Sequence, residues 1–97
     1  MSNRHNETDL KAAIKAMLDH YKLKSKYQQT RIKQLWPALM GPAIKQYTTD
    51  LRISRRVLYV SISSAALKQE LSMGTEKIRR LLNEELGEEY LESVVIR

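Results

Sequence analysis

The chain contains no cysteine. A disulfide framework and a thiolate metal site are therefore excluded, and the composition fits a reducing compartment. No apolar run approaches the roughly 20 residues of a membrane-spanning helix, and residues 1–7 lack the apolar segment of a secretory signal. These absences lead us to expect an intracellular protein in the cytoplasm that has no membrane partner.

The sequence is also poor in groups that do chemistry. It has two histidines, His5 and His20, and no G-x-S-x-G, P-loop, G-x-G-x-x-G or H-E-x-x-H motif. Two separate histidines without cysteine make a poor metal site. Acids gather near the end of a predicted helix (Glu84, Glu85, Glu88 and Glu89), which indicates a solvated or partner-facing patch. We therefore expect no enzymatic activity, no metal, no cofactor and no small-molecule substrate.

Acids are scarce in the middle of the chain in particular. The formal net charge is +6, but residues 20–69 hold ten Lys or Arg and one acid, whereas residues 84–97 hold five acids and one base. A one-sided basic field is what a polyanion partner binds. A solvated surface that keeps the protein soluble explains the charge equally well.

A β-hairpin organises the sequence. Leu51 to Ile53 and Leu58 to Ile62 alternate apolar and polar residues, and Ser54-Arg55-Arg56 separates them. Ser63-Ser64 ends the second strand and offers a hydroxyl N-cap for a following helix. A half-buried hairpin needs helices on its apolar face.

Two helices are predicted before the hairpin. The first begins at Thr8, and its apolar face is expected to point to the core (Leu10, Ile14, Met17, Leu18 and Tyr21). A break at residues 22–25 precedes a second helix from about Ser25 to Met40, which is expected to kink or restart near Trp36 because Pro37 lies inside it. Gly41-Pro42 is a stop signal, and one more helical turn fits residues 43–46.

Two helices with a joint at residues 72–75 follow the hairpin, Gly87 ends the second, and Ser93 to Ile96 form a last strand. The order is α-α-β-β-α-α-β. We predict an α+β fold in which a three-stranded sheet packs against helices. Residues 8–97 form its single domain, after a disordered tail at residues 1–7. The expected core positions are Trp36, Gly41, Leu58, Val60, Leu67 and Leu71.

The segment from Tyr21 to Tyr27 interleaves two aromatic residues with three lysines. Lysines neutralise phosphates, and tyrosine rings stack on unpaired bases. The alternative places Tyr21 in the core and the lysines in water. Arg55-Arg56 at the hairpin tip is a second candidate, or else a charged turn that discourages strand pairing. The candidate nucleic-acid-binding residues are Lys22, Lys24, Lys26, Tyr27, Arg31, Lys33, Arg52, Arg55, Arg56 and Lys68.

An ordered set of short motifs covers about residues 32–97. It consists of Trp36-x-x-x-x-Gly41, Thr48-Thr49, Leu58-Tyr59-Val60, the run from Ser63 to Leu71, Ile78-x-x-Leu81-Leu82-Asn83, Gly87, and Val94-Val95-Ile96-Arg97. This set resembles the DciA-like family of bacterial proteins. The resemblance implies a fold similar to the type II KH domain. It also implies a role beside the replicative DNA helicase, which the factor helps to load or operate, in the cytoplasm near the nucleoid.

Three departures from these patterns limit what the resemblance implies. Family hairpins often carry an Asp-Gly or Asn-Gly turn, whereas this one has Ser54-Arg55-Arg56. Nucleic-acid-binding KH domains use a G-x-x-G loop, whereas the joint here, Ser72-Met73-Gly74-Thr75, has one glycine, so KH-type clamping of the backbone is not expected. Many relatives continue in a basic extension after the domain, whereas this chain ends at Arg97. The resemblance therefore implies only the part of the helicase-loading activity that the domain itself carries.

We therefore expect a non-enzymatic DNA-replication accessory protein that binds single-stranded or forked DNA and the replicative helicase. An RNA-binding KH-like module of translation or RNA processing is the main alternative. A protein-interaction domain whose charge serves solubility is the other.

Overall fold

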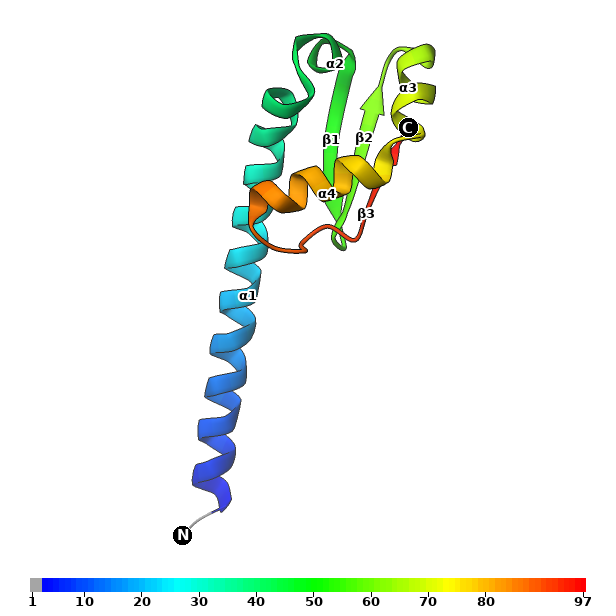
Figure 1. Ribbon diagram of the computed structural model, residues 1–97. Coiled ribbons are helices and arrows are strands. Elements are labelled where there is room, and N and C mark those ends of the chain that lie inside the picture. The colour runs from blue at the N-terminus through cyan, green and yellow to red at the C-terminus, as the bar shows by residue number, and fades with distance from the viewer. Residues whose placement is uncertain (1–2) are drawn as a thin grey trace.

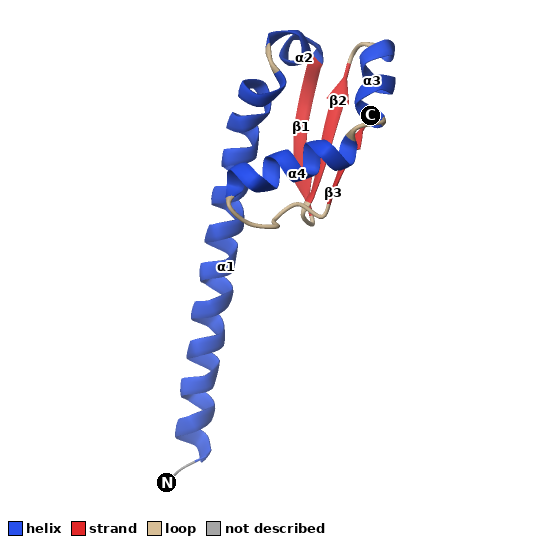
Figure 2. Ribbon diagram, viewed as in Figure 1, coloured by secondary structure: helices blue, strands red, loops and turns tan. Residues whose placement is uncertain are grey.

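The computed structural model describes residues 3–97, with side chains from residue 6 onward. Helices and strands follow one another in the predicted order (Figures 1 and 2). They are α1 (Asn3–Met40), α2 (Pro42–Tyr47), β1 (Thr48–Ser54), β2 (Val57–Ile62), α3 (Ala65–Ser72), α4 (Thr75–Leu86) and β3 (Ser93–Ile96). The α+β class and the helix–strand order of a type II KH domain are therefore confirmed.

The sheet has the strand order β1-β2-β3, in which β1 and β2 form an antiparallel hairpin and β3 is parallel to β2. In Figure 1, α4 crosses one face of this sheet and the C-terminal part of α1 runs beside β1. Leu58, Val60 and Ile62 alternate inward along β2 and are buried with Ile32 and Trp36 of α1. The hydrophobic core therefore lies between this sheet face and the two helices.

The first helix differs from the prediction because α1 is one helix of 38 residues. It begins at Asn3 rather than Thr8, so the tail predicted at residues 1–7 is helical from residue 3, and residues 1 and 2 lie outside the described part. The break predicted at residues 22–25 is absent. This segment holds no glycine or proline, and leucine and lysine favour helix. The helix therefore continues although apolar residues no longer recur there at helical spacing. The helix also continues through Pro37 to Met40 without a restart.

The N-terminal half of α1 extends well beyond the domain (Figure 1). We call residues 6–24 the arm. The chain measures 67 × 20 × 19 Å along its principal axes. The apolar residues predicted to face the core are 44 to 64% exposed on this arm: Leu10, Ile14, Met17, Leu18 and Tyr21. Their predicted burial is wrong because the described domain ends before it reaches them.

The exposed apolar residues continue the line of buried ones along the same helix face. Eighteen residues make about five turns of an α-helix. Ile14 therefore lies in line with Ile32, which is fully buried, and Leu18 in line with Trp36, which is 1% exposed. The arm thus repeats the pattern of a core helix where nothing in the described chain covers it.

The turn of the hairpin is shorter than predicted, because Ser54 still belongs to β1. Arg55 and Arg56 form a two-residue turn with φ angles of 51° and 65°. Positive φ at both central positions is typical of the turns that suit the twist of a hairpin, although Asn and Gly occupy them at lower energy. Two arginines in this conformation need contacts elsewhere that hold the turn.

The later elements begin and end close to the predicted signals. Ser64 is the N-cap of α3, and its Oγ accepts a hydrogen bond of 3.2 Å from the backbone N–H of Leu67. Helix α4 starts at Thr75 with Gly74 in the cap position, and Gly87 ends it in the left-handed region at φ 79°. Leu67 and Leu71, predicted in the core, are partly buried at its margin.

Candidate nucleic-acid interface

A row of lysines follows one side of α1. Its members are Lys11, Lys15, Lys22, Lys26 and Lys33, all of them exposed. Their spacing of four or seven residues keeps them on one side of a helix, over a length of roughly 33 Å. Within residues 3–97 none of them forms an ion pair. We call these five residues the lysine row.

The lysine row leads into a cleft of about 420 Å³ between the end of α1 and the edge strand β1. Residues lining it are Lys33, Trp36, Pro37, Lys45, Thr48, Thr49, Asp50 and Leu51. Trp36 is fixed in its wall, because Nε1 donates a hydrogen bond of 3.0 Å to Thr48 Oγ1, which donates to the carbonyl of Ile44 at 2.7 Å. Lys45 therefore adds a sixth positive charge at the domain end of the row.

Two of the predicted DNA contacts are engaged with α4 and the loop after it. Lys24 Nζ lies 2.7 Å from Glu88 Oε2. Arg31 donates to the carbonyl of Glu85 at 2.8 Å and to that of Leu86 at 3.4 Å, where a cation satisfies the last carbonyls of a helix. Both side chains lie on another side of α1 than the lysine row. Lys24 and Arg31 thus contact α4 and the loop after it, whereas the lysines of the row have no such partner in the described chain.

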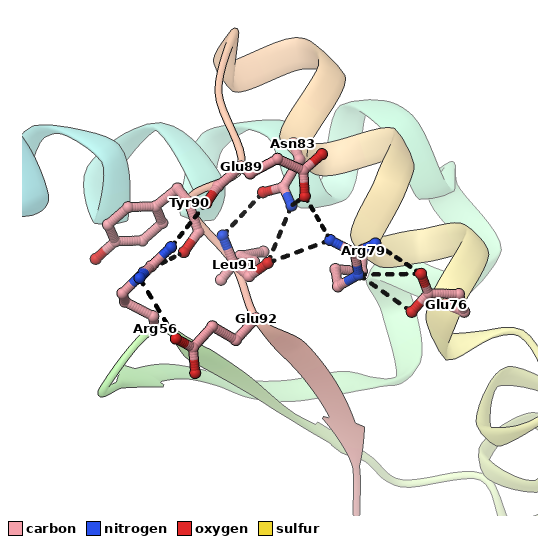
Figure 3. A network of polar contacts seen from close by, with 8 residues as sticks. All are labelled: Arg56, Glu76, Arg79, Asn83, Glu89, Tyr90, Leu91 and Glu92. Carbon is pink, nitrogen blue, oxygen red and sulfur yellow. Dashed lines mark hydrogen bonds and ion pairs between the residues drawn. The ribbon is translucent and has the colours of Figure 1, made fainter.

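The two arginines of the hairpin turn have different surroundings. Arg56 is half-buried and donates from Nε to the carbonyl of Tyr90 at 2.7 Å and from Nη2 to that of Glu89 at 2.8 Å (Figure 3). It also pairs with Glu92 at 3.4 Å. These bonds hold the hairpin tip to the loop between α4 and β3. Arg55 is exposed at the tip and forms no ion pair within the described residues.

The remaining predicted contacts do not join the row. Tyr27 is 62% exposed on α1, with the guanidinium of Arg31 at 6.0 Å from its ring centre. Arg52 is exposed on the sheet face opposite the core, and Lys68 is exposed on α3. Of the predicted residues, the structure thus brings Lys22, Lys26 and Lys33 together. Lys11, Lys15 and Lys45 were missed, although the helical spacing of Lys11, Lys15 and Lys22 was a signal for the first two.

Acidic residues collect at the opposite corner of the domain, where they take part in a network (Figure 3). Arg79 lies 2.6 Å from a carboxylate oxygen of Glu76 and 2.7 Å from one of Glu89. The hydrogen bond from Arg79 holds the pKa of Glu76 below its usual value. Glu88 likewise has a lowered pKa, chiefly because Lys24 donates a hydrogen bond to it. Arg79 is thus the arginine of α4 that forms ion pairs, with Glu76 and Glu89.

Asn83 completes the network at the buried end of α4. Its Nδ2 donates to the carbonyl of Leu91 at 3.0 Å, and its Oδ1 accepts from the N–H of the same residue at 2.9 Å. The side chain therefore replaces a strand partner for one residue of the loop before β3. The motif Leu81-Leu82-Asn83 contains this residue, but no local pattern predicts its contact with Leu91.

Within the described chain, no group of three or more His, Asp or Glu is placed to hold a metal ion. No helix of the described residues is long and apolar enough to cross a membrane.

A family model described as "Dna[CI] antecedent, DciA" matches residues 9–96. Comparisons with curated proteins and with solved structures gave no significant match. The family match includes most of the arm as well as the domain and covers nearly the whole chain. The protein therefore belongs to the DciA family, a family related to the loading of the replicative helicase.

Proposed function

We propose that this protein is a non-enzymatic accessory factor of DNA replication that binds single-stranded or forked DNA through the lysine row and binds the replicative helicase through the arm. Membership of the DciA family supports the replication role. The observation that carries DNA binding is the lysine row, five exposed lysines on one side of α1 without a carboxylate partner among the described residues. We further propose that it acts in the cytoplasm, at the nucleoid.

The charge distribution favours a polyanion at the row over general solubility. Lys24, Arg56 and Arg79 pair with glutamates, and arginines without an ion pair among residues 3–97, such as Arg52, Arg55 and Arg97, are not aligned on one helix as the lysines of the row are. Along the row no such partner is present in the described chain. Phosphates that replace condensed counterions at these lysines would supply binding energy without base specificity.

The apolar face of the arm supports a protein partner. Leu10, Ile14, Met17, Leu18 and Tyr21 form a continuous exposed stripe. The arm holds four lysines and three acids, and two of these acids, Glu7 and Asp9, precede the lysines. Parallel pairing of two arms would bring the lysines of the two copies together. We therefore propose that the occupant is an amphipathic helix of the helicase whose apolar face is flanked by acids.

The DNA surface is tested by reversing Lys22 and Lys26 to Glu together. The expected result is a loss of affinity for single-stranded DNA of all sequences alike, measured by fluorescence anisotropy at low salt, with unchanged thermal unfolding. The matched control reverses Lys77 and Arg80, two exposed bases of α4. If the control loses affinity while the Lys22/Lys26 variant binds like the wild type, the surface is misplaced.

The partner surface is tested with Ile14→Asp and Leu18→Asp in one variant. It should lose capture of the replicative helicase while it keeps DNA affinity. Leu23→Asp is the control, because Leu23 is 69% exposed on the arm but lies away from the stripe. Equal capture by wild type and the double variant would contradict the proposal.

The alternative function, RNA binding, makes a different prediction. A module for RNA should bind an RNA oligonucleotide more tightly than the matched DNA, because it contacts the 2′-OH. The lysine row offers point charges, which do not distinguish the two sugars, so we expect similar affinities for both.

A further inference from the structure

The sheet face opposite the core carries a small group of polar and aromatic side chains. Strand register places Arg52 of β1 opposite Tyr59 of β2, and Tyr59 opposite Val95 of β3. Arg52 is exposed, Tyr59 is partly buried and Val95 is 37% exposed, so this face is accessible. A hollow of about 240 Å³ lies on it, lined by Arg52, Ser54, Tyr59 and Arg97.

Arg97 and Tyr59 form a stacked pair in this hollow. The guanidinium carbon of Arg97 lies 4.5 Å from the centre of the Tyr59 ring, within cation–π range. The backbone of Arg97 is fixed to β2, since its N–H donates to the carbonyl of Val60 and its carbonyl accepts from the N–H of Ile62, both at 2.8 Å. These backbone hydrogen bonds fix the position of Arg97 beside Tyr59.

The charge of the hollow has no internal counterpart. Neither Arg52 nor Arg97 forms an ion pair within the part of the chain that the structure describes. The acid nearest in sequence to Arg52, Asp50, lines the cleft at the edge of β1 instead. A flat aromatic–guanidinium pair beside a second guanidinium is suited to a ligand that has both a planar ring and a negative charge.

We propose that this hollow binds one unpaired base of a single-stranded nucleic acid, stacked on the Tyr59–Arg97 pair, with Arg52 on a neighbouring phosphate. Bases stack on tyrosine rings and on guanidinium planes, and a sheet face is a common platform for this contact. The site is separate from the lysine row. The inference rests on the proposed function only in taking nucleic acid as the class of ligand. Lysines contact phosphates of any strand, whereas this hollow selects bases that are not paired.

The test combines variants with a chemical change in the ligand. Anisotropy is measured on a labelled single strand, on the same strand with abasic sites throughout, and on the matched duplex. Tyr59→Ala should weaken binding of the normal strand roughly 5- to 150-fold, the loss of one stacked base. It should leave binding of the abasic strand and the duplex unchanged, and Tyr59→Phe should restore binding of the normal strand. Tyr47→Ala, at another exposed tyrosine, is the control and should bind like the wild type.

Salt dependence separates the charge of Arg52 from the stacking on Tyr59. Arg52→Gln should flatten the log–log salt slope by about 0.7, the value for one single-strand phosphate contact, whereas Tyr59→Ala should leave the slope unchanged. Equal binding of the normal strand by Tyr59→Ala and wild type would overturn the proposal, and so would an equal loss on the normal and abasic strands. A failure of the lysine row instead appears as unaltered binding by the Lys22/Lys26 variant, so the two failures are distinguishable.

Discussion

Asn83 shows how one side chain holds the loop that follows its own helix. Its two hydrogen bonds satisfy both backbone groups of Leu91 in a buried position. Asn83→Leu keeps a similar volume but leaves the N–H of Leu91 without a partner, and its carbonyl keeps only the 3.5 Å hydrogen bond from Arg79. We therefore expect a loss of about 1–3 kcal/mol for the unsatisfied N–H. Urea unfolding should therefore show a lower midpoint with an unchanged m-value. An unchanged midpoint would mean that Asn83 does not hold the loop.

Glu88 provides a prediction about pH. Its folded-state pKa is lowered by the hydrogen bond from Lys24, so the carboxylate is favoured in the folded state. The resulting stability is complete above the pKa of the unfolded chain and is lost as pH falls through the folded pKa, in the acid range. Removing the amine by Lys24→Met should raise the pKa of Glu88 toward its usual value.

The carbon NMR titration of the Glu88 carboxyl group measures this shift directly. Glu84 in the same protein serves as the internal control. An identical Glu88 pKa in wild type and Lys24→Met would contradict the pairing, and the role of Lys24 as a DNA contact would then have to be reconsidered.

Single residues were the hardest to predict from the sequence. Lys24, Arg31 and Arg56 have the charge and exposure pattern of DNA contacts, but their partners lie 33 to 64 positions away along the chain. A local pattern contains no information about such partners. Trp36, Leu58 and Val60 were predictable, because an aromatic or branched residue on a periodic apolar face is buried whenever a neighbouring element covers that face.

At the scale of elements, α1 contains its own internal control. Ile14 and Ile32 have the same side chain and the same helical phase, but Ile14 is 44% exposed and Ile32 is fully buried. Ile32→Ala should lower the free energy of unfolding by about 2–5 kcal/mol, as expected for a core isoleucine. Ile14→Ala should change it by less than about 0.5 kcal/mol, as expected for a surface position.

Thermal and urea unfolding of both variants check this comparison. A large loss of stability in Ile14→Ala would show that the apolar face of the arm is covered in the isolated protein, for instance by a second copy. That result would contradict an arm that is exposed and awaits another partner.

The elements from Thr48 onward were predictable, whereas the form of α1 was not. The hairpin, α3, α4 and β3 each have a period and a cap signal, such as Ser64 and Gly87, that act locally. In α1 the exposed and the buried segments have the same helical period. Helical phase alone therefore does not distinguish the exposed Leu18 from the buried Trp36. The tertiary contacts that distinguish them depend on where the domain ends.

In the whole molecule, the unpaired lysines of the row and the paired acidic residues lie in different regions. An elongated helix carries the lysine row and the apolar stripe on neighbouring sides, while the acids lie paired at the corner where α4 meets β3. The family match across residues 9–96 includes most of this helix.

The salt dependence of DNA binding tests the central claim most directly. If the five lysines of the row contact phosphates, the log–log slope for a single strand should be at least about 3.5 in magnitude, from about 0.7 per contact. Replacing all five by Gln should remove that part of the slope and leave the fold intact. The account predicts a steep slope in the wild type and a shallow one in the five-lysine variant. The same slope in both proteins would contradict it.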